Sequence, residues 1–340
     1  MKIAIIADPE IPVPPLLYGG IERIIHMLIE QYMYLGHEVS LFAHADSITN
    51  AKLIRYHGKT STGKLDLIKN MWTINLELTL NKYDIIHSFG RLLYLLPQLA
   101  GKTPKIMSYQ REPTTSQISR IQKIARKNSI VFTGCSRYIS DKIRHVATSF
   151  PIYNGVDLKK YDFQSEVPAT APLIFLGRIE PIKGTHIAIE VAKSANKKLL
   201  IAGNVPIEFG QYFKEQIESE LNENIRYIGP VNDIEKNKLL GTGLALLMPI
   251  EWDEPFGIVM AEAMACGTPV IGFRKGSVPE VVSDGVNGFI CDSVKEMCSN
   301  INRITELDRY KVRQDCEKRF SSRVISEQYL NLYQKMIHGT

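Results

Sequence analysis

Apolar residues along the chain gather in short runs that alternate with stretches of helical periodicity. The first run, Lys2–Ala7, leads through a proline-rich loop over Asp8–Tyr18 and a glycine pair into an amphipathic segment that predicts a helix over Ile21–Leu35. A Gly-His pair ends that segment, and Glu38–Ala43 predicts a second strand. A strand-helix-strand unit at the start of the chain favours an α/β fold with a parallel sheet.

The alternation continues to about residue 150. An amphipathic segment over Asp66–Leu80 precedes further predicted strands at Asp84–His87, Lys105–Tyr109 and Ile130–Cys135. Around Pro151 the periodicity stops, because turn residues and prolines continue as far as Pro172. We therefore place a linker between two domains in this region.

The second half of the chain repeats the pattern. The predicted strands are Leu173–Gly177, Lys198–Ala202, Ile225–Gly229, Leu244–Pro249, Pro269–Gly272 and Gly288–Cys291. Helical segments separate most of them, so this half predicts a second Rossmann-like unit. At 340 residues the chain is long enough for two such domains, each with a core of its own.

Composition narrows the class of protein. With 44% hydrophobic and 23% charged residues, the chain resembles an ordinary soluble globular protein. No apolar run approaches the roughly 20 residues that span a bilayer, and the opening MKIAIIADPE lacks the features of a signal peptide. The five cysteines have no paired metal-ligand spacing and are expected to be reduced thiols in the cytoplasm.

The net charge of +5 is mild. It fits either scattered solvated side chains or a face that attracts phosphates or anionic lipid, and composition does not choose between them. We expect no nucleic-acid partner, and peripheral contact with the inner face of a membrane stays open.

Polar residues follow several predicted strands, where an open parallel sheet places its ligand crevice. In the first half these are His87 and the run Gln110, Arg111 and Glu112. A histidine titrates near neutrality and could serve a substrate hydroxyl, although a lone histidine is more often structural.

In the second half, Arg178 ends the first predicted strand and Lys183 follows five residues later at the start of a helix. An arginine and a lysine brought together at a strand end can neutralise a diphosphate, the guanidinium as a fork and the ammonium as a point charge. Taken alone, such a pair is more often a solvated basic turn.

The stretch WDEPFGIVMAEAMACGTPVIGF combines two carboxylates with a glycine. Glu254 lies on the entry loop, and Glu262 lies about one turn into the helix that begins after Gly257. Apolar residues surround Glu262 on both sides in the sequence, which favours a buried or cleft-facing acid over a surface one. Two acids would repel a diphosphate but accept hydrogen bonds from hydroxyls, so a sugar nucleotide supplies partners for both the acids and the cations.

Two glycine-rich segments could bind phosphate. Gly19 and Gly20 stand at a predicted helix start, where exposed amides favour an anion, although a simple turn is an even alternative. The run GKTSTGK over Gly58–Lys64 has the spacing of a phosphate loop, but no apolar strand precedes it, and Leu65 stands where a magnesium-binding hydroxyl is needed. We interpret the second run as a decoy.

Several motifs together closely resemble the retaining family 4 glycosyltransferases of the two-domain GT-B fold. They are EPFGIVMAE, EAMACGTPVI, GSVPEVVSDGVNGFI, FLGRIEPIKG, YNGVD, YIGPV and YGGIER. The resemblance spans most of the chain and implies two Rossmann-like domains facing across a cleft. It implies an acceptor domain over 1–152, a donor domain over 153–322, and a C-terminal helix over 323–340 that crosses back to the first domain. Val324–Ile337 has suitable amphipathic spacing for that helix.

The resemblance also assigns roles to residues. It implies that Arg178 and Lys183 hold the donor diphosphate, that Glu262 binds the ribose, and that Glu254 binds the donor sugar. Further donor-binding positions are implied at Gly19, Gly20, Gly229, Val231, Phe256, Gly257 and Ile258.

One position departs from the family pattern. Members often carry a histidine after the fourth strand, and the matching stretch here, MSYQREP, has Gln110 at about that place. Glutamine can hydrogen-bond a sugar but cannot relay a proton, so His87 or a substrate phosphate would have to do so. The chain also lacks an Asp-x-Asp pair for a divalent metal, which suits a metal-independent site without a cofactor.

The sequence thus predicts a metal-independent hexosyltransferase that moves a sugar from a nucleoside diphosphate donor, with retained configuration, to an acceptor hydroxyl. Family prevalence favours a uridine diphosphate donor, and the acceptor is expected to be a glycan or a lipid-linked molecule. Closure of the two domains would assemble the site. The alternatives are a sugar-nucleotide epimerase or phosphorylase of the same fold, and a non-catalytic sugar-nucleotide-binding partner.

Overall fold

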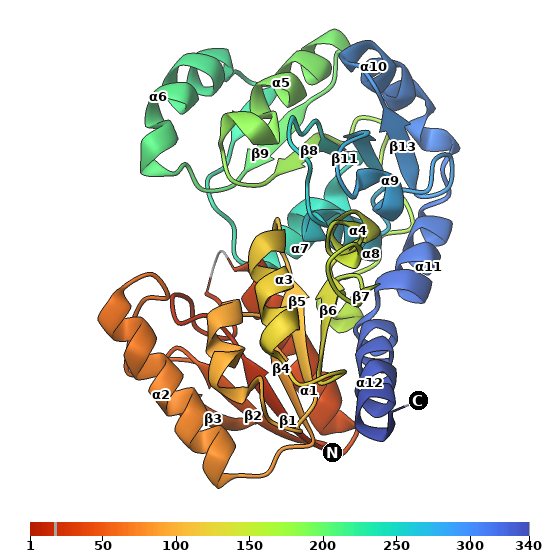
Figure 1. The fold of residues 1–340 in the computed structure, drawn as a ribbon. Coiled ribbons are helices and arrows are strands. Elements are labelled where there is room, and N and C mark those ends of the chain that lie inside the picture. Colours follow the sequence, from red (N-terminus) through yellow and green to blue (C-terminus); the bar gives the residue numbers. More distant parts are fainter. Residues whose placement is uncertain (17–18, 340) are drawn as a thin grey trace. The chain divides into compact units, whose positions relative to one another are not determined.

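The computed structural model describes residues 1–16 and 19–339, and the chain forms two compact units (Figure 1). The first unit contains Met1–Gly155 and the C-terminal segment from Ser322, and the second contains Val156–Ser321. The predicted boundaries lie within a few residues of these divisions. Leu17 and Tyr18, which end the expected proline-rich loop and begin the YGGIER motif, lie outside the described residues.

The first unit is built on a seven-stranded parallel sheet with the order β3-β2-β1-β4-β5-β6-β7. Its strands are β1 (Lys2–Ile6), β2 (Glu38–Ala43), β3 (Lys52–Arg55), β4 (Ile85–Ser88), β5 (Lys105–Tyr109), β6 (Ile130–Gly134) and β7 (Ser149–Pro151). The strand order reverses between β1 and β4, and an open α/β sheet opens a ligand crevice at the carboxyl ends of such neighbours.

Helices of the first unit come from both ends of the chain. They are α1 (Gly20–Tyr34), α2 (Lys64–Leu80), the 3₁₀-helix η1 (Leu92–Gln98), α3 (Thr115–Ile124), α4 (Arg137–Arg144) and α12 (Ser322–His338). The last helix, α12, packs beside α1, and the hydroxyl groups of Tyr32 and Tyr333 lie 3.0 Å apart in that interface. The C-terminal helix therefore completes the core of the first unit although the second unit precedes it in the sequence (Figure 1).

The second unit has a six-stranded parallel sheet with the order β10-β9-β8-β11-β12-β13. Its strands are β8 (Leu173–Leu176), β9 (Leu199–Ala202), β10 (Ile225–Tyr227), β11 (Ala245–Met248), β12 (Val270–Phe273) and β13 (Gly288–Cys291). This is the Rossmann order, and it reverses between β8 and β11. The predicted fold class, two Rossmann-like α/β domains, is confirmed.

Helices cover the second sheet in two packed groups. The first group is α5 (Thr185–Ser194) with α10 (Val294–Arg303), and the second is α7 (Asp233–Thr242), α8 (Ile258–Ala265) and α11 (Arg309–Phe320). Shorter elements are η2 (Leu158–Lys160), η3 (Pro181–Lys183), η4 (Ile207–Phe209), α6 (Gly210–Tyr212), η5 (Phe213–Ile217), η6 (Glu218–Glu220), α9 (Val278–Val281) and η7 (Ile304–Glu306). The core contains the fully buried side chains of the central strands, including Leu173, Ile201, Leu247 and Ile271.

The second unit begins and ends at one place. Val156 and Ser321 form an isolated parallel bridge, and the Val156 N–H donates to the Phe320 carbonyl at 2.8 Å. The two connections to the first unit therefore leave the second unit side by side. Among the described residues, no helix is long and apolar enough to cross a membrane.

Candidate active site

The loop after β11 presents Glu254 to a lysine and an indole. Lys183 Nζ lies 2.5 Å from Glu254 Oε2, and Trp252 Nε1 donates to the same oxygen at 3.1 Å. The ammonium also lies 4.7 Å from the centre of the Trp252 ring. The Glu254 side chain is only 12% exposed, so burial strengthens these contacts. Glu254 and Lys183, predicted from distant parts of the sequence, therefore lie together.

Close backbone approaches bring these residues to one place. Gly184 is the residue before α5 and has a φ of 73°, and a Cβ there would lie 1.9 Å from the carbonyl oxygen of Pro249, which follows β11. Gly276 has a φ of 51°, and a Cβ there would lie 2.4 Å from the Glu254 nitrogen. Only glycine fits both positions without strain. The Ser277 N–H donates to the Glu254 carbonyl at 2.9 Å, which holds the loop from the other side.

Arg178 follows β8 and has an acidic partner of its own. Its Nη2 lies 2.9 Å from Glu180 Oε1, and the Glu180 side chain is 5% exposed while that of Arg178 is 35% exposed. Both cations predicted to hold a diphosphate are therefore oriented by carboxylates in this structure. A bound diphosphate would have to share or replace those partners.

Glu262 lies in α8 and is buried, as predicted. Its Oε1 accepts hydrogen bonds from Lys236 Nζ at 2.5 Å and from the Tyr161 hydroxyl at 2.7 Å. Lys236 lies in the first turn of α7, where it also lies 3.4 Å from Asp233. Both hydrogen bonds go to Oε1, so Oε2 has no partner among the described residues and could accept a ligand hydroxyl.

The remaining predicted donor-binding residues of the second unit lie at the start of α8 and in the segment before α7. Gly257 is the residue before α8 and Ile258 is its first residue, while Gly229 and Val231 lie on the turn between β10 and α7. The Phe256 side chain is 2% exposed and packs against Phe320 at a ring distance of 5.7 Å. Only its backbone could contact a sugar.

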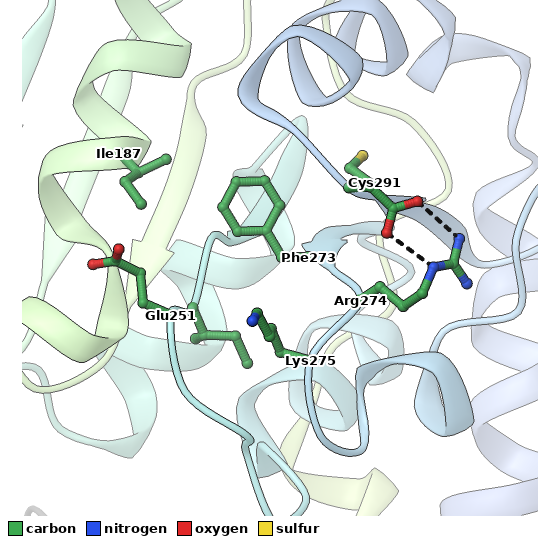
Figure 2. Close-up of a pocket in the computed structure, with 8 residues that line it drawn as sticks. Ile187, Glu251, Phe273, Arg274, Lys275 and Cys291 are labelled. Atoms are coloured by element: carbon green, nitrogen blue, oxygen red, sulfur yellow. Dashed lines mark hydrogen bonds and ion pairs between the residues drawn. The ribbon is translucent and has the colours of Figure 1, made fainter.

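A cavity of about 400 Å³ opens beside this loop at the carboxyl ends of β11, β12 and β13 (Figure 2). Its walls are Ile187, Ile250, Glu251, Phe273, Arg274, Lys275, Cys291 and Asp292. Arg274 Nε donates to Asp292 Oδ1 at 3.0 Å across one wall. No residue predicted to bind the donor lines this cavity.

His87 is not a crevice residue. Its side chain is fully buried, with Nδ1 2.5 Å from the Tyr333 hydroxyl and Nε2 2.6 Å from Ser108 Oγ. Burial lowers the pKa of His87 to about 3, so the ring stays neutral. The expectation that His87 serves a substrate hydroxyl is wrong, because α12 covers the face of β4 to which its side chain points.

The residues after β5 have varied surroundings. Asn154 Nδ2 donates to Gln110 Oε1 at 2.7 Å, and Gln110 Nε2 is buried without a partner among the described residues. Arg111 Nη2 lies 3.0 Å from Asp8 Oδ2, whereas Glu112 is exposed and pairs with Lys142 at the surface. Gln110 is thus the member of the run with a buried donor that lacks a partner among the described residues.

Acids surround the predicted anion site at the start of α1. Gly19 precedes that helix and Gly20 is its first residue, and a Cβ on Gly19 would lie 2.9 Å from Glu22 Oε2. Burial raises the pKa of Glu22, and the charges of Asp8 and Glu10 raise it further. Burial also raises the pKa of Asp8, despite its contact with Arg111. Negative charge here opposes a phosphate, so the anion-binding role of the glycine pair stays a prediction.

The glycine-rich run before α2 has no free phosphate cradle. Asp66 Oδ2 accepts hydrogen bonds from the backbone N–H groups of Lys59 and Thr60, both at 3.1 Å, and from the Thr60 hydroxyl at 3.2 Å. The amides that would bind phosphate are therefore occupied by a carboxylate of the following helix. This agrees with the interpretation of the run as a decoy.

Sequence reasoning did not single out Asp8, Tyr161 or Lys236. Asp8 is the first polar residue after a strand, which is the signal that pointed to Gln110. The position of Lys236 could also have been noticed in the sequence. A lysine in the first turn of a helix interacts unfavourably with the positive end of the helix dipole, so it is expected to pair with a carboxylate. Tyr161 carried none.

Comparisons with known proteins show the family of this chain. The family model described as "Glycosyltransferase Family 4" matches residues 18–160, and the one described as "Glycosyl transferases group 1" matches residues 159–322. The chain belongs to the family 4 glycosyltransferases. Together the two matches cover both units, with the second model spanning all the residues predicted to bind the donor in the second unit.

Individual members of the family are distant relatives. The Bacillus subtilis spore coat protein SA is 24% identical over 98% of this chain and its own full length. A Rickettsia africae glycosyltransferase matches with a TM-score of 0.80 and 18% identity, covering 100% of this chain and 99% of its own. Anabaena HepE, solved with UDP-glucose, matches with a TM-score of 0.73 and 17% identity, covering 98% of this chain and 100% of its own. These structural matches establish the GT-B fold of this family 4 glycosyltransferase.

Proposed function

We propose that this glycosyltransferase moves a hexose, with retained anomeric configuration, from a nucleoside diphosphate sugar to an acceptor hydroxyl. The observation that carries the proposal is the pair of largely buried carboxylates at one edge of the second sheet, each bonded to a lysine. Carboxylates accept hydrogen bonds from the hydroxyls of a sugar and a ribose, and cations neutralise a diphosphate. The UDP-glucose bound to Anabaena HepE supports uridine diphosphate as the leaving group.

Each side chain then has a part in the reaction. Lys183 exchanges Glu254 for a phosphate oxygen, and the freed carboxylate binds the hydroxyls of the donor sugar. Arg178 and the amides at the start of α8 share the charge of the departing diphosphate. Glu262 Oε2 accepts a ribose hydroxyl. The acceptor hydroxyl loses its proton to a phosphate oxygen on the same face as the bond that breaks.

The acceptor is proposed to be a glycan or lipid-linked molecule bound by the first unit, in a cytoplasmic pathway of glycoconjugate synthesis. Gln110 has an unused amide donor that could bind a sugar hydroxyl, but it cannot transfer a proton. This assignment needs no metal ion because Arg178 and Lys183 carry the countercharge. Transfer should therefore persist in EDTA, and loss of transfer in EDTA would contradict a metal-independent mechanism.

The test is transfer or donor turnover with a panel of nucleoside diphosphate sugars. Glu254→Gln and Arg178→Ala should each lower kcat/KM by about 10²- to 10³-fold, because each removes a group that meets the transition state. Glu251→Gln is the matched control, since Glu251 is an exposed acid on the same loop. Wild-type rates in both site variants would contradict the assignment. Conversion of the donor without an acceptor would indicate an epimerase instead.

A further inference from the structure

The outward face of α2 carries large apolar side chains that nothing in the described first unit covers. Leu65, Ile68, Trp72, Leu76 and Leu80 are 75%, 63%, 64%, 42% and 72% exposed. Their spacings of three and four residues put all five on one side of the helix. Scattered exposed apolar residues are normal, but a continuous row on one helix marks a surface that binds something.

The opposite side of the same helix packs against the rest of the first unit. Ile74 and Asn70 are fully buried, and Asn75 accepts a hydrogen bond from Gln98 of η1 at 2.6 Å, so this side attaches α2 to the unit. The exposed apolar row is therefore not the side that holds the helix on the unit, and a contiguous exposed apolar surface marks an interaction site. In Figure 1, α2 lies along the outside of the first unit. The row of exposed apolar side chains on α2 therefore has no partner within the described first unit.

Charge identifies what covers this face. Both acids of α2 are used within the unit, since Asp66 bonds to the preceding loop and Glu77 Oε1 lies 2.6 Å from Lys52 Nζ. Lys64 and Lys69 are exposed on α2, and neither has an ion-pair partner among the described residues. Two more exposed lysines, Lys59 and Lys82, flank the helix ends. The surface is thus apolar with a basic border and no free carboxylate on the helix.

We infer that the outward face of α2 docks the protein on an anionic lipid bilayer. Leu, Ile and Trp side chains enter the boundary between headgroups and acyl chains, while the lysines contact anionic headgroups. Protein interfaces are depleted in lysine, so the basic border favours lipid over a protein partner. This inference does not depend on the proposed donor chemistry, because it concerns a surface of the first unit alone.

The test is co-sedimentation of the full chain with vesicles, without any substrate. The protein should pellet with phosphatidylcholine vesicles that contain roughly one-third phosphatidylglycerol, and much less with phosphatidylcholine alone or in high salt. Trp72→Glu should weaken this binding by about tenfold or more. Ile207→Glu is the matched control, because Ile207 is 98% exposed on the second unit, and it should bind like the wild type.

A second pair of variants tests the role of the lysines separately from that of Trp72. Lys64→Glu with Lys69→Glu should weaken binding, whereas Lys123→Glu with Lys127→Glu changes the net charge equally on another exposed surface of the unit and should not. Tryptophan emission should shift to the blue on anionic vesicles in the wild type but not in Trp72→Phe.

Three results would overturn the inference. One is the absence of binding to anionic vesicles, and another is equal binding by the wild type and Trp72→Glu when both have the same circular dichroism and melting temperature. The third is a wild-type dimer in light scattering that Trp72→Glu converts to a monomer, since this would make the face an interface between two copies.

Discussion

Near the start of α1, the carboxylates of Asp8, Glu10 and Glu22 repel one another, which is an electrostatic conflict between single residues. Glu22 is 7% exposed, and burial raises its pKa together with the nearby carboxylates Asp8 and Glu10. The sequence could predict the glycine pair and the helix start at this point, because both are local signals. It could not predict the crowding of acids, since Asp8 and Glu22 meet only after β1 and α1 have packed together.

This conflict gives a prediction for Glu22→Gln. A raised folded-state pKa means that the folded protein holds the proton more tightly, so the wild type loses stability as pH rises through that pKa. The amide cannot ionise, and Glu22→Gln should therefore unfold at a higher urea concentration than the wild type at pH 7. The gain should disappear near pH 4, where the unfolded state is also protonated. A variant less stable than the wild type at pH 7 would contradict this reading.

At the scale of elements, the candidate donor site depends on helices that approach one another at the edge of the second sheet. Strand positions and the fold class were predictable, because apolar runs and polar strand ends are local patterns. The ion pairs of Lys183 with Glu254 and of Arg178 with Glu180 were not predicted. The edge strands β3 and β7 were not predicted, since Lys52–Arg55 is partly exposed and Ser149–Pro151 is short and ends in proline. The contact of Lys236 with Glu262 was missed because it joins α7 to α8 across 26 residues.

The Lys236–Glu262 pair should behave as a buried ion pair. Lys236→Met leaves Glu262 buried with only the Tyr161 hydroxyl as a partner, and breaking such a pair costs about 3–5 kcal/mol of unfolding free energy. The double variant Lys236→Met with Glu262→Gln removes both charges and should recover much of that loss. Urea denaturation of the wild type, both single variants and the double variant completes the cycle. Additive losses would mean that the two side chains do not interact.

The same cycle separates stability from ligand binding. Glu262→Gln should weaken nucleoside diphosphate binding with or without the lysine, because the carboxylate itself meets the ribose in the proposed site. Lys236→Met is instead a positioning change, and its effect on affinity should be smaller than its effect on stability.

At the scale of the whole molecule, the C-terminal helix fastens the end of the chain to the first unit through a buried polar network. Tyr333 and Tyr329 of α12 reach His87, Ser108 and Thr133 on three neighbouring strands. The sequence could predict α12 from its amphipathic spacing. It could not predict that His87 belongs to this network, because a histidine at a strand end has the same local signal whether it faces a crevice or a helix.

This network makes the first unit sensitive to acid. The pKa of His87 falls from its ordinary value of 6.5 to about 3 on folding, so between these values the unfolded chain takes up a proton that the folded chain refuses. Stability therefore decreases as pH falls through this range. His87→Gln keeps hydrogen-bonding groups but cannot titrate, and its unfolding free energy should change less than that of the wild type between pH 7 and about pH 4.5.

The variant Tyr333→Phe should lose about 1–3 kcal/mol of unfolding free energy at pH 7, because His87 Nδ1 is left without its partner, yet it should keep the wild-type pH dependence. Equal pH dependence in the wild type and His87→Gln would show that His87 is not the group that makes the fold acid-sensitive.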